Sequence, residues 1–288
     1  MIPALETPTT TRRLPWVELA WFGALLLASY APILARLVRQ WDHDPDMSHG
    51  FFVPFITAFL IWRRRDELAA LKTRPNWWGL LVVLYGTAQL YVATLGAELF
   101  LARTAFVITV FGAVWMLGGT LMVRRLFFPL ALLFFMIPIP AVIYNRITFP
   151  LQFLASHLAG DALAFLGLPV LREGNILELP NQRLSVVEAC SGIRSLLTLT
   201  YLSLVYGHFF EKNHWIRAAL FVSTVPIAIL ANASRVTVTG LITEWKPEWA
   251  EGFFHTAQGW VIFMVSLFSL IVLHQILMRL SAPKGAHP

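Results

Sequence analysis

The sequence has little charge and almost no cysteine. Only 13% of its 288 residues are Asp, Glu, Lys or Arg, against roughly 25% in soluble domains. With 57% hydrophobic residues and a mean hydropathy of +0.66, it cannot cover a surface that faces water. Soluble enzymes and disordered chains are therefore excluded, and the composition indicates a polytopic membrane protein. The single cysteine, Cys190, has no partner for an internal disulfide, which excludes a disulfide-stapled secreted domain.

The chain also lacks any basic run interleaved with aromatic residues. Its 22 Lys and Arg exceed its 16 Asp and Glu, giving a formal charge of +6. In a membrane protein such an excess is typical of cytoplasmic loops. We therefore expect no nucleic-acid partner.

Long apolar stretches fill most of the chain. A helix needs about 20 mostly apolar residues to cross the hydrocarbon core. The sequence predicts an all-α protein with about eight such spans, the second of them short. They are Pro15–Leu37, Gly50–Trp62, Trp77–Leu95, Thr104–Val123, Leu126–Tyr144, Gly192–Phe210, Ala218–Ile242 and Thr256–Leu280.

The distribution of Lys and Arg predicts the orientation of these spans. With the N-terminus in the cytoplasm, 13 of the 22 lie on the inner side, as the positive-inside rule favours. Eight spans then place both termini inside. The predicted parts are a cytoplasmic tail (1–14), a membrane domain (15–280) whose first span is not a cleaved signal peptide, and a second cytoplasmic tail (281–288).

The longest gap between spans, 145–191, is predicted to form a small cap on the outer face. Its first part, Arg146–Leu166, is apolar with scattered polar residues, which favours an amphipathic helix at the interface or re-entering the bundle. The segment Val170–Val187 alternates around two turn signals, Gly174-Asn175 and Pro180-Asn181, and predicts a β-hairpin. A simple connector is the alternative, and whether the hairpin binds a substrate stays open.

Cys190 lies within a polar segment, Glu188-Ala-Cys-Ser-Gly-Ile-Arg194, that leads into the sixth span. In the first turn of a helix, free backbone N–H groups stabilise a thiolate. Arg194 follows one turn later and adds positive charge on the same face. These features favour a reactive thiol over a packing cysteine.

Arg235 lies within the predicted seventh span, where a charged side chain is costly and marks a candidate functional site. Asn232 and Thr239 share its helical face by their i−3 and i+4 spacing. This polar stripe is expected to point into the bundle. The alternative is an arginine that reaches out to the membrane boundary.

His255 lies at the outer start of the eighth span, and a histidine can act as base and acid in turn. The predicted topology thus brings a thiol, a guanidinium and an imidazole from three spans to one face. They supply a nucleophile, a charge for a developing oxyanion and a proton acceptor, the groups required for acyl transfer through a thioester.

One further outer cluster contains His43, His49, Asp42, Asp44 and Asp46. Such side chains could bind zinc or manganese. Because their spacing on a loop specifies little, a solvated loop is the favoured interpretation. We expect neither a metal nor an organic cofactor.

Several motifs resemble those of the exosortase/archaeosortase family. They are SHG at 48–50, EACSGIR at 188–194, NASR at 232–235 and FHTAQGW at 254–260, and the resemblance covers about residues 40 to 280. Members of that family are thought to act as membrane cysteine proteases or transpeptidases, analogous to sortases. Their substrates are exported proteins with a C-terminal sorting signal: a short PEP-CTERM-like motif, a membrane helix and a basic tail.

The resemblance implies roles for individual residues. It makes Cys190 the nucleophile, Arg235 the stabiliser of the transition state and His255 the general base and acid. Supporting roles fall to Arg194, Asn232, Glu188 and His49. It also implies a bacterial inner-membrane enzyme whose site faces the periplasm, with an amine acceptor of unknown identity and a connection to exopolysaccharide production.

Two other classes of function remain open on the sequence. A transporter could use Arg235 and Asn232 to bind an anionic solute; it would tolerate Cys190→Ser. A non-catalytic scaffold of exopolysaccharide assembly would tolerate the loss of all three candidate catalytic residues.

Overall fold

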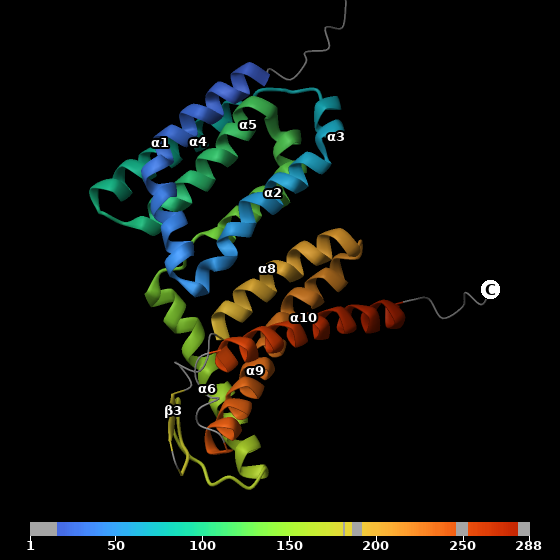
Figure 1. Cartoon of the computed structure of the whole chain (residues 1–288). Helices are drawn as coiled ribbons and strands as arrows, with labels where there is room; N and C mark the ends of the chain where they lie inside the picture. The colour runs from blue at the N-terminus through green and yellow to red at the C-terminus, as the bar shows by residue number, and fades with distance from the viewer. Residues whose placement is uncertain (1–15, 181, 186–191, 246–252, 282–288) are drawn as a thin grey trace, which may run out of the picture. The chain divides into compact units, whose positions relative to one another are not determined.

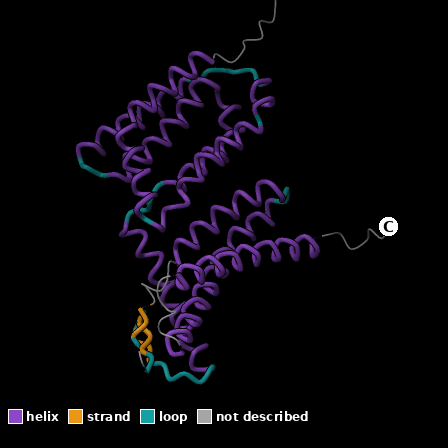
Figure 2. The backbone as a smooth tube through the Cα atoms, in the orientation of Figure 1, coloured by secondary structure: helices purple, strands orange, loops and turns teal. Residues whose placement is uncertain are grey.

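The computed structural model describes residues 16–180, 182–185, 192–245 and 253–281, which are predominantly helical (Figure 1). The chain forms two compact units, Met1–Ile139 and Pro140–Pro288. Figure 2 shows that the described strands lie together in one small sheet of the second unit.

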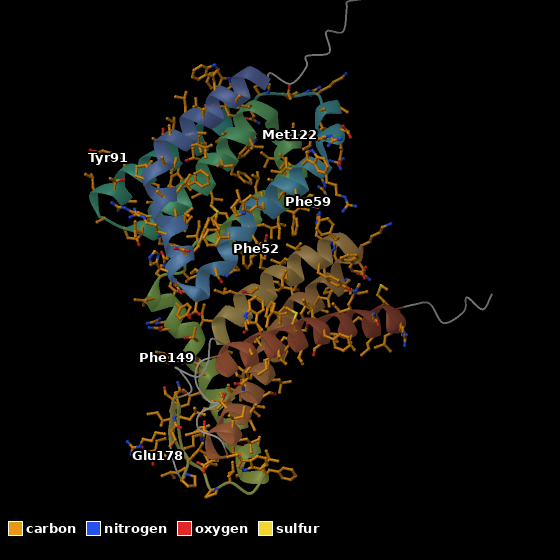
Figure 3. The ribbon with its side chains drawn as sticks, in the orientation of Figure 1. Phe52, Phe59, Tyr91, Met122, Phe149 and Glu178 are labelled. Atoms are coloured by element: carbon orange, nitrogen blue, oxygen red, sulfur yellow. The ribbon has the colours of Figure 1, made fainter. Side chains whose placement is uncertain are left out.

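Five of the described helical stretches are long and apolar enough to cross a membrane. Large apolar side chains on these helices and on the shorter ones are exposed, among them Phe52, Phe59 and Tyr91 (Figure 3). Apolar surface of this extent suits a lipid solvent and would be a liability in water. The prediction of a helical polytopic membrane protein is confirmed. The count of eight spans and their orientation stay predictions.

From residue 16 onward, the first unit contains five α-helices and two short 3₁₀ helices. The predicted third span coincides with α4, which begins after the capping side chain of Asn76. The predicted second span is α2, whose 12 residues reach roughly 18 Å, well short of the hydrocarbon core. The elements are α1 (Trp16–His43), η1 (Pro45–Phe51), α2 (Phe52–Arg63), α3 (Arg65–Ala70), α4 (Trp77–Leu95), α5 (Leu99–Leu132) and η2 (Leu133–Met136).

The long element α5 consists of two helices that reverse direction at Gly119. This glycine has a φ of 80° and a ψ of 179°, a conformation that a side chain would strain. The rings of Phe111 and Phe127 lie 6.2 Å apart, whereas sixteen residues of straight helix would separate them by about 24 Å. The predicted fourth and fifth spans are thus two helical arms, but the turn precedes the expected boundary at Arg124.

The end of the predicted fifth span, Tyr144, is wrong. The helix ends at Leu132, η2 follows, and α6 begins anew at Ala141. The physical reason lies in Pro138 and Pro140, which lack the N–H groups that would continue the helix. The predicted amphipathic helix Arg146–Leu166 is therefore part of a longer helix that starts five residues earlier.

In the second unit, α6, α8 and α10 all pack against α9. The predicted sixth span coincides with α8, and the seventh and eighth lie within α9 and α10. Leu199, Ile216, Leu220 and Leu270 form a buried core between α8, α9 and α10. The elements are α6 (Ala141–Phe165), β1 (Leu171–Glu173), β2 (Ile176–Glu178), β3 (Arg183–Ser185), α8 (Gly192–Phe210), α9 (His214–Trp245) and α10 (Phe253–Ser281).

A three-stranded antiparallel sheet, in the order β1-β2-β3, covers α6 and α9. Gly174, with a φ of 63°, and Asn175 make the first turn, as the sequence predicts. The expected hairpin is extended by β3, so that a meander replaces it. Leu177 and Leu184 of the sheet pack into one core with Leu163 of α6 and Val236 of α9. Phe149 on α6 and Glu178 on β2 mark the two elements in Figure 3.

Candidate functional site

The polar stripe of α9 is buried, as its spacing predicts. Asn232 and Arg235 are each 8% exposed, and Thr239 is 4% exposed. All three lie in the second half of α9 (His214–Trp245), between apolar residues such as Ala233 and Val236 that are buried as well. The guanidinium of Arg235 is therefore held inside the second unit and does not reach out to the membrane boundary.

Arg235 lies directly against the beginning of α10. A Cβ atom placed on Gly259 would be 3.5 Å from Nη2 of Arg235 and 3.6 Å from its Cζ. His255 precedes Gly259 by four residues on α10, so the two share one helical face and are about 6 Å apart along the helix axis. The backbone of α10 thus puts the face that carries His255 beside the guanidinium of Arg235.

Gln258 joins α10 to α9 by two hydrogen bonds next to Arg235. Its Nε2 donates to the backbone carbonyl of Arg235 at 2.9 Å, and its Oε1 accepts from the hydroxyl of Thr239 at 3.1 Å. The sequence analysis included Gln258 in a motif but gave it no role. Its i+3 spacing from His255 is the signal that could have identified it as a residue of the same face.

A small cavity adjoins Asn232. Its volume is about 20 Å³, which is room for one water molecule. Its lining includes Asn232 on α9, Leu196 on α8, and Thr148 and Gln152 on α6, together with apolar residues of α6 and α9. Because Leu196 follows the first residue of α8 by one turn, the cavity lies between Asn232 and the first turns of α8.

The remaining predicted residues of this site are only partly described. Cys190 and Glu188 lie outside the described residues, and so do the side chains of Arg194 and His255. The backbone of α8 begins at Gly192, two residues after Cys190 in the sequence, and Arg194 falls in its first turn. The described residues therefore bring together Arg235, Asn232, Thr239 and Gln258, and the contacts of the thiol and the imidazole stay predictions.

His49, a predicted supporting residue, lies in the first unit and has a structural role there. It is buried, and its Nε2 bonds to the carbonyl oxygen of Phe135 at 3.1 Å. Trp41 covers Gly50 and donates to the next carbonyl, that of Met136, at 2.9 Å. That carbonyl lacks a helical donor because Pro140 occupies the required position.

Burial lowers the pKa of His49, although hydrogen bonds to the carbonyls of Phe135 and Asp46 and the charge of Asp46 act in the opposite direction. The segment before α2 is thus a 3₁₀ helix with His49 buried, whereas Asp42 and His43 are exposed, as expected of the solvated loop that the sequence favoured. His43 and Asp44 instead bond to the local backbone. Within the described part of the chain, no three His, Cys, Asp or Glu side chains gather as a metal ion would require.

A second buried polar cluster, which the sequence analysis missed, joins the ends of α8 and α10. The carboxylate of Glu211 accepts from Nε2 of His274 at 3.1 Å, and Nδ1 of His274 is 2.9 Å from the hydroxyl of Tyr206. The backbone N–H groups of Lys212 and Asn213 both donate to Glu211 at 2.7 Å. Glu211 and His274 are 63 residues apart, so no local spacing relates them.

In comparisons with known proteins, the chain matches the model of one protein family. The family model "Transmembrane exosortase" (Exosortase_EpsH) matches residues 41–272, which cover both units of the fold and the stripe of Arg235. No curated protein and no solved structure gave a match. The matched region includes all four motifs quoted from the sequence. On this evidence the chain belongs to the transmembrane exosortase family.

Proposed function

We propose that this exosortase-family protein is a membrane cysteine transpeptidase or protease that removes the C-terminal sorting signal of exported proteins. The observation that carries the proposal is the position of Arg235, buried on α9 and packed against Gly259 one turn beyond His255. A buried guanidinium beside a helical face with a histidine suits the stabilisation of an oxyanion during acyl transfer.

The first half of the reaction forms a thioester. The thiolate of Cys190 attacks the carbonyl carbon of the scissile peptide bond, and the negative charge that develops on oxygen is stabilised by Arg235. The tetrahedral intermediate collapses, the C–N bond breaks, and the amine of the sorting signal leaves with a proton from His255. The protein substrate then remains bound to Cys190 as a thioester.

The second half releases the product. His255 takes a proton from an amine acceptor or from water, which attacks the thioester carbonyl and expels Cys190 as a thiolate. An amine gives transpeptidation and water gives hydrolysis. The scheme requires only side chains of this protein and proceeds without a metal or an organic cofactor.

The surroundings of Arg235 support the proposal of a binding site there. The substrate's membrane helix would dock laterally, bringing its motif to the outer, periplasmic face of the inner membrane. Asn232 lines a small cavity together with Leu196, one turn into α8, and Cys190 precedes the first residue of that helix by two positions in the sequence. Gln258 holds the facing helices at a fixed distance. Arg194, close to the thiol in sequence, is assigned to stabilising the thiolate by its positive charge, and Glu188 to a supporting role such as orienting His255.

The decisive experiment compares protein C-termini in the cell envelope by mass spectrometry. The native host expresses either the wild-type protein or Cys190→Ala at matched levels. We expect a set of proteins to keep a hydrophobic tail with a basic end only in the variant. The same spectra identify the cut site and any attached group, which separates transpeptidation from hydrolysis.

Two further variants make the result specific. His255→Ala should give the same unprocessed proteins, whereas His157→Ala, which removes an exposed histidine paired with Asp161 on α6, should leave processing intact. Wild-type processing in Cys190→Ala would refute the nucleophile. Tolerance of Cys190→Ser combined with loss of function in Arg235→Ala would instead support an anion transporter.

A further inference from the structure

A basic pocket lies in the first unit of the fold. It is formed by the segment that joins α3 to α4 and by the turn of α5 around Gly119, which pass beside each other in Figure 1. Its volume is about 670 Å³. Lys72, Arg74 and Arg124 line it, and none of its lining residues is acidic. The neighbouring Arg125, by contrast, pairs with Glu67 at 2.8 Å.

The walls of this pocket are fixed by hydrogen bonds. The backbone N–H of Asn76 donates to the carbonyl of Met116 at 3.2 Å, and its side-chain amide donates to the hydroxyl of Thr120 at 3.2 Å. The indole of Trp115 donates to the same hydroxyl at 3.0 Å. At Gly119 the carbonyl of Arg74 occupies the place of a side chain. The pocket is therefore built into the fold and does not depend on a ligand for its shape.

Two tryptophans indicate the depth of the pocket in the membrane. Trp77 and Trp78 open the apolar helix α4 immediately after the lining residue Asn76, and they are 81% and 64% exposed. Tryptophan is enriched at the level of the lipid headgroups, where its ring meets both hydrocarbon and water. Headgroup depth is thus the level expected for the three cationic residues, and Leu71 and Leu121 of the pocket offer apolar contact for the adjoining acyl chains.

We propose that this pocket binds the phosphate headgroup of an anionic phospholipid. Two arginines and one lysine among the lining residues match a phosphodiester, which accepts charge-assisted hydrogen bonds from Arg in particular. Basic pockets of membrane proteins at this depth are suited to anionic headgroups. The bound lipid would anchor α4 and the turn of α5 in one leaflet, and this role is independent of the proposed chemistry at Cys190.

The test measures lipid binding to the purified protein in detergent by native mass spectrometry. The probes are phosphatidylglycerol, phosphatidylcholine and inorganic phosphate. We expect preferential retention of phosphatidylglycerol, and at least a tenfold loss of its affinity in the double variant Arg74→Gln/Arg124→Gln. The matched control, Arg125→Gln, removes an adjacent exposed charge that does not line the pocket and should retain the lipid.

Both arms of the experiment can overturn the proposal. Equal retention of phosphatidylcholine, or an equal loss in Arg125→Gln, would show that the pocket does not select an anionic headgroup. Binding of inorganic phosphate that depends on Arg74 and Arg124, without retention of phosphatidylglycerol, would assign the site to a soluble anion instead. Thermal denaturation of each variant verifies folding, and the single substitution Lys72→Gln, which should lower the affinity less, provides a milder second variant.

Discussion

Two buried charged side chains of the second unit, Glu211 and Arg235, have different surroundings. Glu211, just before α9, is enclosed by donors: two backbone N–H groups bond to one carboxylate oxygen and His274 bonds to the other. Arg235, in the second half of α9, is beside Gly259, and its neighbour Asn232 lines a cavity. The first arrangement surrounds its charge with hydrogen-bond donors, whereas the second packs its charge against a glycine of the next helix.

This difference separates a structural cluster from a candidate active site. A carboxylate whose oxygens are occupied by fixed donors stabilises the helices that supply them, but it has no lone pair aimed at a substrate. In the proposed reaction, a guanidinium that packs against the glycine of the helix carrying His255 stabilises the oxyanion. The comparison therefore predicts that substitutions at Arg235 reduce activity and that substitutions at Glu211 reduce stability.

Arg235→Lys gives the largest expected effect. The lysine keeps the positive charge but loses the planar fork of donors and does not reach the same position. Removal of one oxyanion donor typically lowers kcat by about 100- to 1,000-fold. We expect a loss of this size in the processing of a purified tailed substrate, with the melting temperature in detergent nearly unchanged. Unfolding of the variant at ordinary temperature would assign Arg235 a structural role like that of Glu211.

Glu211→Gln should give the opposite result. Hydrogen bonds to a charged group contribute about 1.5–3 kcal/mol, so the variant should unfold at a lower temperature while the folded protein processes substrate at the wild-type rate. The N–H of Asn213 is the main cause that lowers the pKa of Glu211, aided by His274 and Lys212 against the effect of burial.

The lowered pKa of Glu211 also determines how its contribution to stability depends on pH. A carboxylate whose pKa is lower in the folded state stabilises the protein fully above its ordinary value of 4.5. The stabilisation is lost as the pH falls from there through the folded pKa. The melting temperature of the wild-type protein should therefore fall over this acid range, and that of Glu211→Gln should fall less. An unchanged acid profile would show that another group controls the transition.

Much of this fold follows from local signals in the sequence. The bounds of α4 and α8 agree with the predicted spans, because α4 starts at a Pro-Asn cap and α8 ends where a polar segment, Glu211 to Asn213, begins. The burial of Asn232, Arg235 and Thr239 follows from helical spacing and the cost of a charge in lipid. Both inferences use only residues that are close in the sequence and the periodicity of the α-helix.

The features that were missed depend on tertiary contacts. The turn of α5 was expected at Arg124-Arg125, where charge interrupts the apolar run, but it occurs at Gly119, where only a glycine tolerates the approach of Arg74. Gln258 bridges α9 and α10, and Glu211 bonds to a histidine 63 residues away. None of these partners is specified by local sequence, since each contact forms only when the helices pack.

The smallest predicted effect comes from substitutions at Gly259. Its contact with Arg235 is what distinguishes the surroundings of Arg235 from those of Glu211. A Cβ atom on Gly259 would be 3.5 Å from Nη2 of Arg235, an ordinary van der Waals distance. Gly259→Ala should therefore leave the guanidinium in place and change kcat by less than about twofold, whereas Gly259→Leu has to displace it and should lower kcat roughly tenfold, about 1.4 kcal/mol. The melting temperatures of the two variants provide the control, because both remove the same flexible glycine from the first part of α10. Equal activity in Ala and Leu variants would show that Arg235 does not need its position beside α10, and the proposed pairing of Arg235 with the face of His255 would then fail.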